Sequence, residues 1–283
     1  MSQLHFVQLS DTHIRKDYTA GTLHDMFTDL ISPDKKLRQI LSELREEKLD
    51  FIVISGDLVH EGNEADYQKL KNIIDAIDFQ VPILLALGNH DNKKAFCNVF
   101  EQNLKNEKYY YSRQIKDWKV VVLDSASNGH GLGEIDKEQI EWLERICRDN
   151  EQIIIFMHHP VFWEDALLQI GENRERLIKA LSHSNVKAVF CGHVHRNSMK
   201  EIENIRQFTV ESTACGFDYN IEGIDEQERS GYLKCTLKDD SIEIENCFCG
   251  TDNVYKIPND TLKSVLDKKE QENAEGRQLY IIN

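Results

Sequence analysis

The chain has 283 residues, of which 40% are hydrophobic and 29% charged, and its formal net charge is −15. This composition is typical of an ordinary globular protein, and the length fits one α/β unit with an attached tail. The strong negative charge argues against a large nucleic-acid interface, since the average field of the surface would repel a duplex.

Six short apolar runs predict buried strands. Most are nearly continuous rather than alternating, which is the pattern of strands that are covered on both faces. In chain order they occupy residues 4–9, 51–54, 83–87, 120–123, 153–157 and 186–191.

Helical periodicity lies between these runs. Ser32, Pro33 and Asp34 are typical of an N-cap and first turn, and an apolar stripe from Leu37 to Leu44 follows them. A second stripe spans residues 70–77, and Asp136 precedes a third. Strands and helices thus alternate over the first two thirds of the chain, which predicts an α/β sheet core.

The pattern changes after residue 191. Residues 206–210, 231–237 and 242–248 predict strands with polar breaks, added to a sheet in antiparallel or mixed fashion. We expect one domain over residues 1–255 and a C-terminal helix and tail over 256–283. The apolar end at 279–282 would dock on the body or on a partner chain, as in a homodimer, or would fray.

Residues that bind metals follow five of the six apolar runs. In open α/β sheets, ligand sites form beyond the carboxyl ends of the strands, so residues far apart in sequence would converge there. The five blocks are Asp11-Thr12-His13, Gly56-Asp57, Gly88-Asn89-His90-Asp91, His158-His159-Pro160 and Gly192-His193-Val194-His195.

These residue types suit a centre of two metal ions. Imidazole and carboxylate groups bind Mn, Fe or Zn, a carboxylate can bridge two ions, and an asparagine carbonyl adds a neutral ligand. Two divalent ions beside Asp11 and Asp57 would keep a surplus of about two positive charges, which binds a phosphate and activates water to hydroxide. A small phosphorylated substrate is compatible with the acidic surface, because the metals reverse the field locally.

The five blocks resemble those of the calcineurin-like metallophosphoesterase superfamily. The resemblance implies a four-layer α/β/β/α sandwich with two mixed sheets. It also implies that Asp11, His13 and His195 hold one metal, that Asn89, His158 and His193 hold the other, and that Asp57 bridges them. His90 would not bind metal but would contact the substrate phosphate and stabilise or protonate the leaving oxygen.

Within the superfamily the chain resembles class III cyclic-nucleotide phosphodiesterases and their glycerophosphodiesterase relatives. Asp124-Ser125 and Ser212-Thr213-Ala214 are among the segments that carry this likeness. It implies hydrolysis of a small phosphodiester by metal-activated hydroxide. In addition to Asn89 and His90, the residues Asn63 and His159 are candidates for contact with the substrate.

Other functions remain open on the sequence. A phosphomonoesterase or nucleotide pyrophosphatase would use the same metals, and some superfamily members are non-catalytic scaffolds. Scaffolds usually lose ligands or the histidine of Gly-Asn-His, whereas all seven ligands and His90 are present here.

The cysteines and the apolar segments of the sequence predict the cellular compartment of the protein. Seven dispersed cysteines without a Cys-x-x-Cys pair favour a reduced protein with buried thiols. The first fifteen residues lack the uninterrupted apolar core of a signal peptide, and no run approaches transmembrane length. We therefore expect a cytoplasmic protein that is not bound to a membrane.

Overall fold

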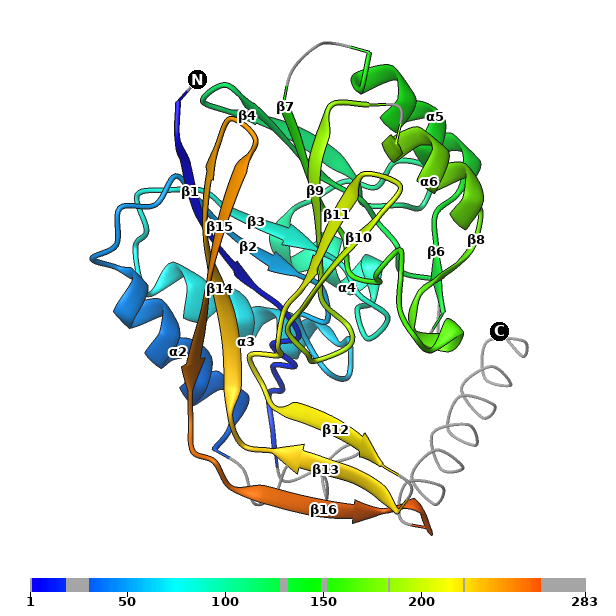
Figure 1. Ribbon diagram of the computed structural model, residues 1–283. Coiled ribbons are helices and arrows are strands. Elements are labelled where there is room, and N and C mark those ends of the chain that lie inside the picture. Colours follow the sequence, from blue (N-terminus) through cyan, green and yellow to red (C-terminus); the bar gives the residue numbers. More distant parts are fainter. Residues whose placement is uncertain are drawn as a thin grey trace, which may run out of the picture.

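Four layers make up the body of the protein. The computed structural model describes residues 2–18, 31–127, 132–148, 152–182, 184–220 and 222–260. Two large sheets stack face to face, and helices cover the outer face of each (Figure 1). This arrangement confirms the predicted α/β/β/α sandwich with two mixed sheets.

The first large sheet has five strands in the order β15-β14-β1-β2-β3. β1, β2 and β3 run parallel, and β14 pairs antiparallel with both β1 and β15. The strand bounds are β1 Leu4–Leu9, β2 Phe51–Ser55, β3 Ile83–Ala86, β14 Ser230–Lys238 and β15 Ser241–Cys249.

The second large sheet has six strands in the order β10-β11-β9-β7-β5-β4. Its four central strands run parallel, and the edge strands β4 and β10 pair antiparallel with their neighbours. The bounds are β4 Tyr111–Ile115, β5 Trp118–Val122, β7 Gln152–Phe156, β9 Val186–Cys191, β10 Ser198–Ile202 and β11 Ile205–Thr209.

Side-chain caps begin three of the α-helices. Asn63, Asn92 and Asp136 each accept a hydrogen bond from the backbone N–H three residues later, which satisfies one of the free donors of the first turn. Among the described residues, Ser32 makes no such bond at the start of its helix. The helices are α2 Pro33–Leu44, α3 Glu64–Asp75, α4 Lys93–Phe100, α5 Lys137–Ile146 and α6 Arg174–Ser182, with a short 3-10 turn η1 at Ala166–Leu168.

The core has three parts, because each sheet is covered on both faces. Residues of α2, α3 and α4 pack on the first sheet, and residues of α5 and α6 pack on the second. Between the sheets, Phe6 meets Phe156 and Phe190 edge to face at centroid distances of 5.4 and 5.2 Å. Burying each such ring stabilises the fold by roughly 1.5–3 kcal/mol. This double covering explains why the strand sequences are almost wholly apolar.

Two smaller sheets were not predicted. β12 Gly216–Asn220, β13 Gly223–Gln227 and β16 Val254–Pro258 form an antiparallel sheet at one end of the sandwich (Figure 1). β6 Gly133–Glu134 and β8 Ile170–Glu172 pair in parallel. β16 crosses the predicted domain boundary after residue 255, and the predicted tail beyond residue 260 lies outside the described residues. The division into domain and tail stays a prediction.

No helix within the described ranges has both the length and the apolar character needed to cross a membrane.

Candidate metal centre

Five strands of the two large sheets end at one place. β1, β2 and β3 of the first sheet precede Asp11, Asp57 and Asn89, and β7 and β9 of the second precede His158 and the pair His193 and His195. Because the strands of each set run parallel to one another, their carboxyl ends meet at one edge of the sandwich.

The first group of side chains comprises Asp11, His13 and His195. The Nε2 atom of His195 lies 3.2 Å from Asp11 Oδ1 and 3.4 Å from His13 Nε2. The Nδ1 atom of His195 donates to the carbonyl of Cys215 at 3.0 Å, so that a neutral ring leaves its Nε2 lone pair facing the other two residues.

The second group comprises Asn89, His158 and His193. His158 donates from Nδ1 to the carbonyl of Ser55 at 3.0 Å, and its Nε2 lies 3.2 Å from Asn89 Oδ1. The ring of His193 lies 5.0 Å from that of His158. Asn89 and His193 are half-buried, whereas His158 is fully buried, so the centre meets solvent on the side of the first two.

Asp57 stands between the two groups. Its Oδ2 lies 3.3 Å from His158 Nε2 and 3.9 Å from His13 Nε2. The other oxygen, Oδ1, accepts the backbone N–H of His90 at 2.9 Å. Asp11 is arranged in the same way, with Oδ2 accepting the N–H of His193 at 3.0 Å. Each carboxylate thus gives one oxygen to a neighbouring loop and turns the other toward the histidines.

Close approach of backbone to carboxylate requires glycine at two positions. A Cβ at Gly88 would lie 2.2 Å from Asp57 Oδ1, and one at Gly192 would lie 1.8 Å from Ser10 Oγ and 2.6 Å from Asp11 Oδ2. The glycines of Gly-Asn-His and Gly-His-x-His are therefore part of the site, since they let the loops reach the two aspartates.

Five of the seven predicted ligands have a left-handed backbone conformation. Such conformations are rare for residues with a side chain, cost roughly 1–3 kcal/mol each, and gather at functional sites. The φ angles are 51° at Asp11, 42° at His13, 46° at Asp57, 71° at His193 and 49° at His195. Several loops are thus held away from their relaxed conformation at one place.

The electrostatics of the centre favour bound cations. Burial raises the pKa of Asp57, but the nearby His158 and His90 outweigh it and hold that pKa well below the ordinary value. The pKa of Asp11 is likewise lowered by His195 and His158 against the effect of burial. Burial lowers the pKa of His193 to about 3, with His158 adding to the effect. Burial lowers the pKa of His158, but Asp57 and Asp11 outweigh it and raise that pKa to about 9, so a bound metal would displace a proton from this ring. The ionised carboxylates and the neutral His193 are already in the protonation states that metal ligation requires.

Two orphaned atoms show that the residues fit a metal. Asp11 Oδ1 and His193 Nε2 are buried and take part in no hydrogen bond among the described residues. A buried polar atom without a partner is costly, and a coordinated ion would satisfy both. The described residues contain four sets of three His or Asp side chains whose ligand atoms lie within 4.8 Å of one another, and these sets include Asp11, His13, Asp57, His158, His193 and His195.

His90 and His60 lie beside the first group. His90 donates from Nδ1 to the carbonyl of His60 at 3.0 Å, so its Nε2 lies on the opposite side of the ring. The ring of His90 stands 4.9 Å from that of His13, almost perpendicular to it. His60 Nδ1 lies 3.2 Å from His13 Nδ1, so His60 supports a predicted ligand.

His159 is fully buried and points toward the second group. Its ring lies 4.4 Å from that of His193. Ser125 Oγ accepts the backbone N–H of His159 at 3.0 Å and meets its Nδ1 at 2.9 Å. Ser125 itself adjoins Asp124, which forms a buried ion pair with Lys93 at 2.9 Å. Sequence reasoning did not assign Ser125 to the site, and only its contacts with His159 place it there.

Two other residues of the motifs have structural contacts. Asn63 caps α3 through Asp66 and is exposed, so its predicted contact with substrate stays a prediction. Asn92, rather than Asp91, makes the cap bond of α4. The Asp91 carboxylate accepts instead from the N–H groups of Leu58 and Gly88 at 3.1 and 2.8 Å, and so ties two site loops together.

Curated relatives of the chain are named as phosphodiesterases. The chain is 28% identical over 244 residues to a probable cyclic nucleotide phosphodiesterase of Rhodococcus erythropolis, a match that covers 82% of this chain and 79% of that protein. It is also 28% identical over 228 residues to a glycerophosphodiester phosphodiesterase of Enterobacter lignolyticus, which covers 72% of this chain and 76% of that protein.

Solved structures share the fold. A dimetal phosphatase from Danio rerio superposes with a TM-score of 0.65 at 14% identity, covering 87% of this chain and 98% of that one. A purple acid phosphatase from yellow lupin superposes with a TM-score of 0.62 at 16% identity, covering 90% of this chain and 53% of that one.

A family model described as calcineurin-like phosphoesterase matches residues 4–197, the segment that contains all five blocks of the site. The chain therefore belongs to the calcineurin-like phosphoesterase family.

Proposed function

We propose that the protein hydrolyses small phosphodiesters at a centre of two divalent metal ions. The observation that carries the proposal is the convergence of five strand ends on buried carboxylate and imidazole atoms, two of which lack any hydrogen bond among the described residues. The names of the curated relatives, a probable cyclic nucleotide phosphodiesterase and a glycerophosphodiester phosphodiesterase, suggest the class of substrate.

The contacts support a division of the predicted ligands between two metals. Asp11, His13 and His195 would hold one ion and Asn89, His158 and His193 the other. Asp57 would bridge, since its Oδ2 lies within 4 Å of the Nε2 atoms of both His158 and His13. Mn, Fe and Zn all suit a set of imidazole, carboxylate and amide donors. When bound, two such ions lower the pKa of water and offset the charge of a phosphate.

His90 is the best candidate for a catalytic acid. The Nδ1–H of His90 donates to the carbonyl of His60, so Nε2 is directed away from that carbonyl. The ring of His90 packs edge to face against the ring of His13. His90 is half-buried, so a substrate can reach it. A protonated Nε2 would donate to the leaving oxygen of the ester and stabilise its negative charge.

Removal of the metals should destabilise the fold as well as stop the reaction. An ion at a concentration of about 100 times its dissociation constant stabilises the folded state by about 2.7 kcal/mol. In a domain of this size that corresponds to roughly 5–10 °C in the melting temperature. We expect treatment with a chelator, followed by gel filtration, to lower the melting temperature by this amount, and added Mn or Zn to restore it. An unchanged melting temperature after verified loss of metal would contradict the proposed centre.

A substrate panel tests the preference for diesters. We expect the protein with its metals to hydrolyse bis-(p-nitrophenyl) phosphate at least tenfold faster than p-nitrophenyl phosphate, measured as kcat/KM from released p-nitrophenol. The leaving group is the same in both, so the comparison reports the ester class. A reversed preference would identify a phosphomonoesterase, and no activity with bound metals on either compound or on nucleotides would favour a non-catalytic scaffold.

A further inference from the structure

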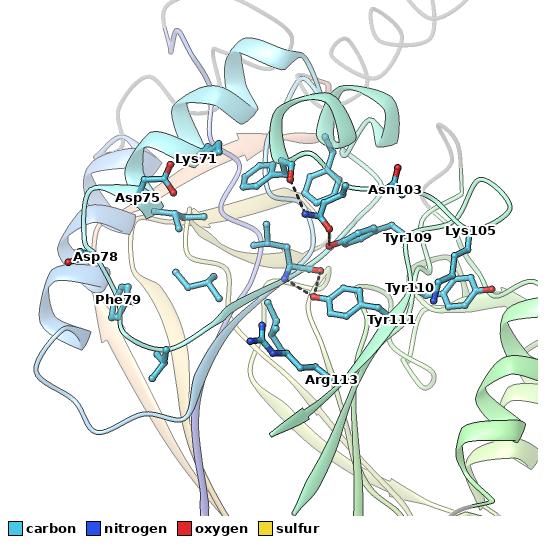
Figure 2. Close-up of a pocket in the computed structure, with 18 residues that line it drawn as sticks. Lys71, Asp75, Asp78, Phe79, Asn103, Lys105, Tyr109, Tyr110, Tyr111 and Arg113 are labelled. Atoms are coloured by element: carbon cyan, nitrogen blue, oxygen red, sulfur yellow. Dashed lines mark hydrogen bonds and ion pairs between the residues drawn. The ribbon is translucent and has the colours of Figure 1, made fainter. Parts of the chain in front are cut away.

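A cavity of about 800 Å³ lies away from the predicted ligands. Its walls come from β3, the end of α3, α4 and the segment that leads into β4 (Figure 2). None of the seven predicted ligands lines it. A hollow of this size is within the range of small-molecule sites, which are concave, largely apolar and supplied with a few convergent polar groups.

Aromatic rings form much of the wall. Tyr109, Tyr110 and Tyr111 stand on one side and Phe79 on the other (Figure 2). Tyr109 and Tyr110 are buried, and Tyr110 packs on Trp142 at a centroid distance of 4.8 Å. Rings fixed in this way present flat apolar surfaces on which a planar group can pack.

An open strand edge supplies polar groups to the same cavity. β3 is the last strand of its sheet, and the hydroxyl of Tyr111 bonds both the N–H and the C=O of Leu85 at 3.1 Å. Backbone groups alternate between the two sides of a strand, so those of Ile83 point the same way as those of Leu85. β2 does not engage Ile83, because Ile52 donates to Pro82 instead. Ile83 therefore offers one donor and one acceptor at the cavity wall.

The charges at the rim are uneven. Lys71, Lys105 and Arg113 line the cavity together with two carboxylates, Asp75 and Asp78. Lys71 is paired with Asp75 at 2.6 Å. Figure 2 places the two carboxylates at one end and Arg113 and Lys105 at the side of the three tyrosines. That side is positive, in a chain whose net charge is −15.

We propose that this cavity is a second site, which binds a nucleotide. The base packs between the aromatic walls and pairs through its donor and acceptor edge with the backbone of Ile83. The phosphate lies toward Arg113 and Lys105. A nucleotide matches all three features of the cavity. Its planar base suits the aromatic walls, the donor and acceptor of the base suit the strand edge, and its phosphate suits the positive rim. This binding does not depend on the reaction proposed for the metal centre.

A nucleotide bound in the cavity would affect the metal centre through the elements that form the cavity walls. β3 leads directly into Gly88 and Asn89, and α4 begins three residues after His90. A bound nucleotide that shifts β3 against α4 would move the loop that carries Asn89 and His90, so its addition should change the rate on bis-(p-nitrophenyl) phosphate.

Binding of a fluorescent AMP analogue that carries an N-methylanthraniloyl group on the ribose tests the proposal. The protein with its metals is titrated in saturating inorganic phosphate, which occupies the metal centre. We expect one remaining site per chain. Arg113→Glu removes the positive rim and Asn103→Trp fills the mouth of the cavity, and each should weaken binding about tenfold or more. The matched control is Arg38→Glu, which reverses an exposed arginine on α2 and should leave binding unchanged.

Two results would overturn the second site. These are equal binding by the two cavity variants and the control, and competition by adenosine as strong as that by AMP. All variants should keep the melting temperature of the parent and its rate on bis-(p-nitrophenyl) phosphate without nucleotide. The melting temperature separates loss of the cavity from loss of the fold. The rate tests the metal centre independently of nucleotide binding.

Discussion

Asp57→Asn is expected to lower kcat/KM for bis-(p-nitrophenyl) phosphate by about 10²–10³-fold, the scale of loss when a group that organises transition-state charge is removed. The substitution keeps the side-chain shape but removes one negative charge from between the two ligand groups. Oδ2 of Asp57 stands 3.3 Å from His158 Nε2, so an amide there would offer a weaker oxygen to each metal. Elemental analysis should show fewer than two ions per chain.

The melting temperature distinguishes this effect from misfolding. Without metals, the Asp57→Asn variant should be less stable than its parent at neutral pH, because the lowered pKa of Asp57 means that its ionised form stabilises the folded state. With metals it should gain less stability than the parent does. Asp240→Asn, which alters an exposed carboxylate paired with Lys187, is the matched control and should leave rate and metal content unchanged. Two bound ions together with a normal rate in Asp57→Asn would refute the bridge.

His90→Ala is expected to retain both metals and to lose rate. Loss of a positioned proton donor costs about 10²–10⁴-fold when the leaving group needs protonation. The loss should therefore be large for an alkyl diester such as glycerophosphoethanolamine. It should be small for a p-nitrophenyl diester, whose phenolate leaves without a proton. Measurement of kcat for both compounds gives the contrast directly.

The control for this experiment is His5→Ala. His5 lies at the start of β1 and bonds Thr236, away from the strand ends that carry the site. It should change neither rate. Loss of a metal from His90→Ala would mean that the division of ligands is wrong. An equal loss on both diesters would mean that His90 positions the phosphate rather than protonating the leaving group.

The placement of the site could be predicted because it depends on strand order along the chain. Residues 51–54 and 153–157 are apolar throughout, and the structure covers both of those strands on both faces. Polar blocks that follow parallel strands of one sheet must lie at the same edge of that sheet, which predicts one cluster of polar residues for each sheet. Asp57 and His158 follow strands of different sheets, so their meeting also depends on how the two sheets stack.

Two kinds of feature could not be predicted from the sequence: contacts made by backbone atoms, and short strands that are rich in polar residues. The carbonyls of Ser55, His60 and Cys215 orient three of the histidines, and a carbonyl carries no sequence signature. Asp91 and Asn92 are both good capping residues, so only the start of α4 decides between them. β12 and β13 are five residues long and contain many polar residues, a pattern that loops share.

The left-handed conformation of the predicted ligands sets folding against function at five positions. Glycine would adopt the φ angles of Asp11, His13, Asp57, His193 and His195 with little strain, so replacing any one of them would relax its loop. A library of variants sorted for thermal resistance in the presence of a chelator would therefore drift toward glycine at these positions and lose the site. With metals present, the stability gained on binding the ions would oppose that drift.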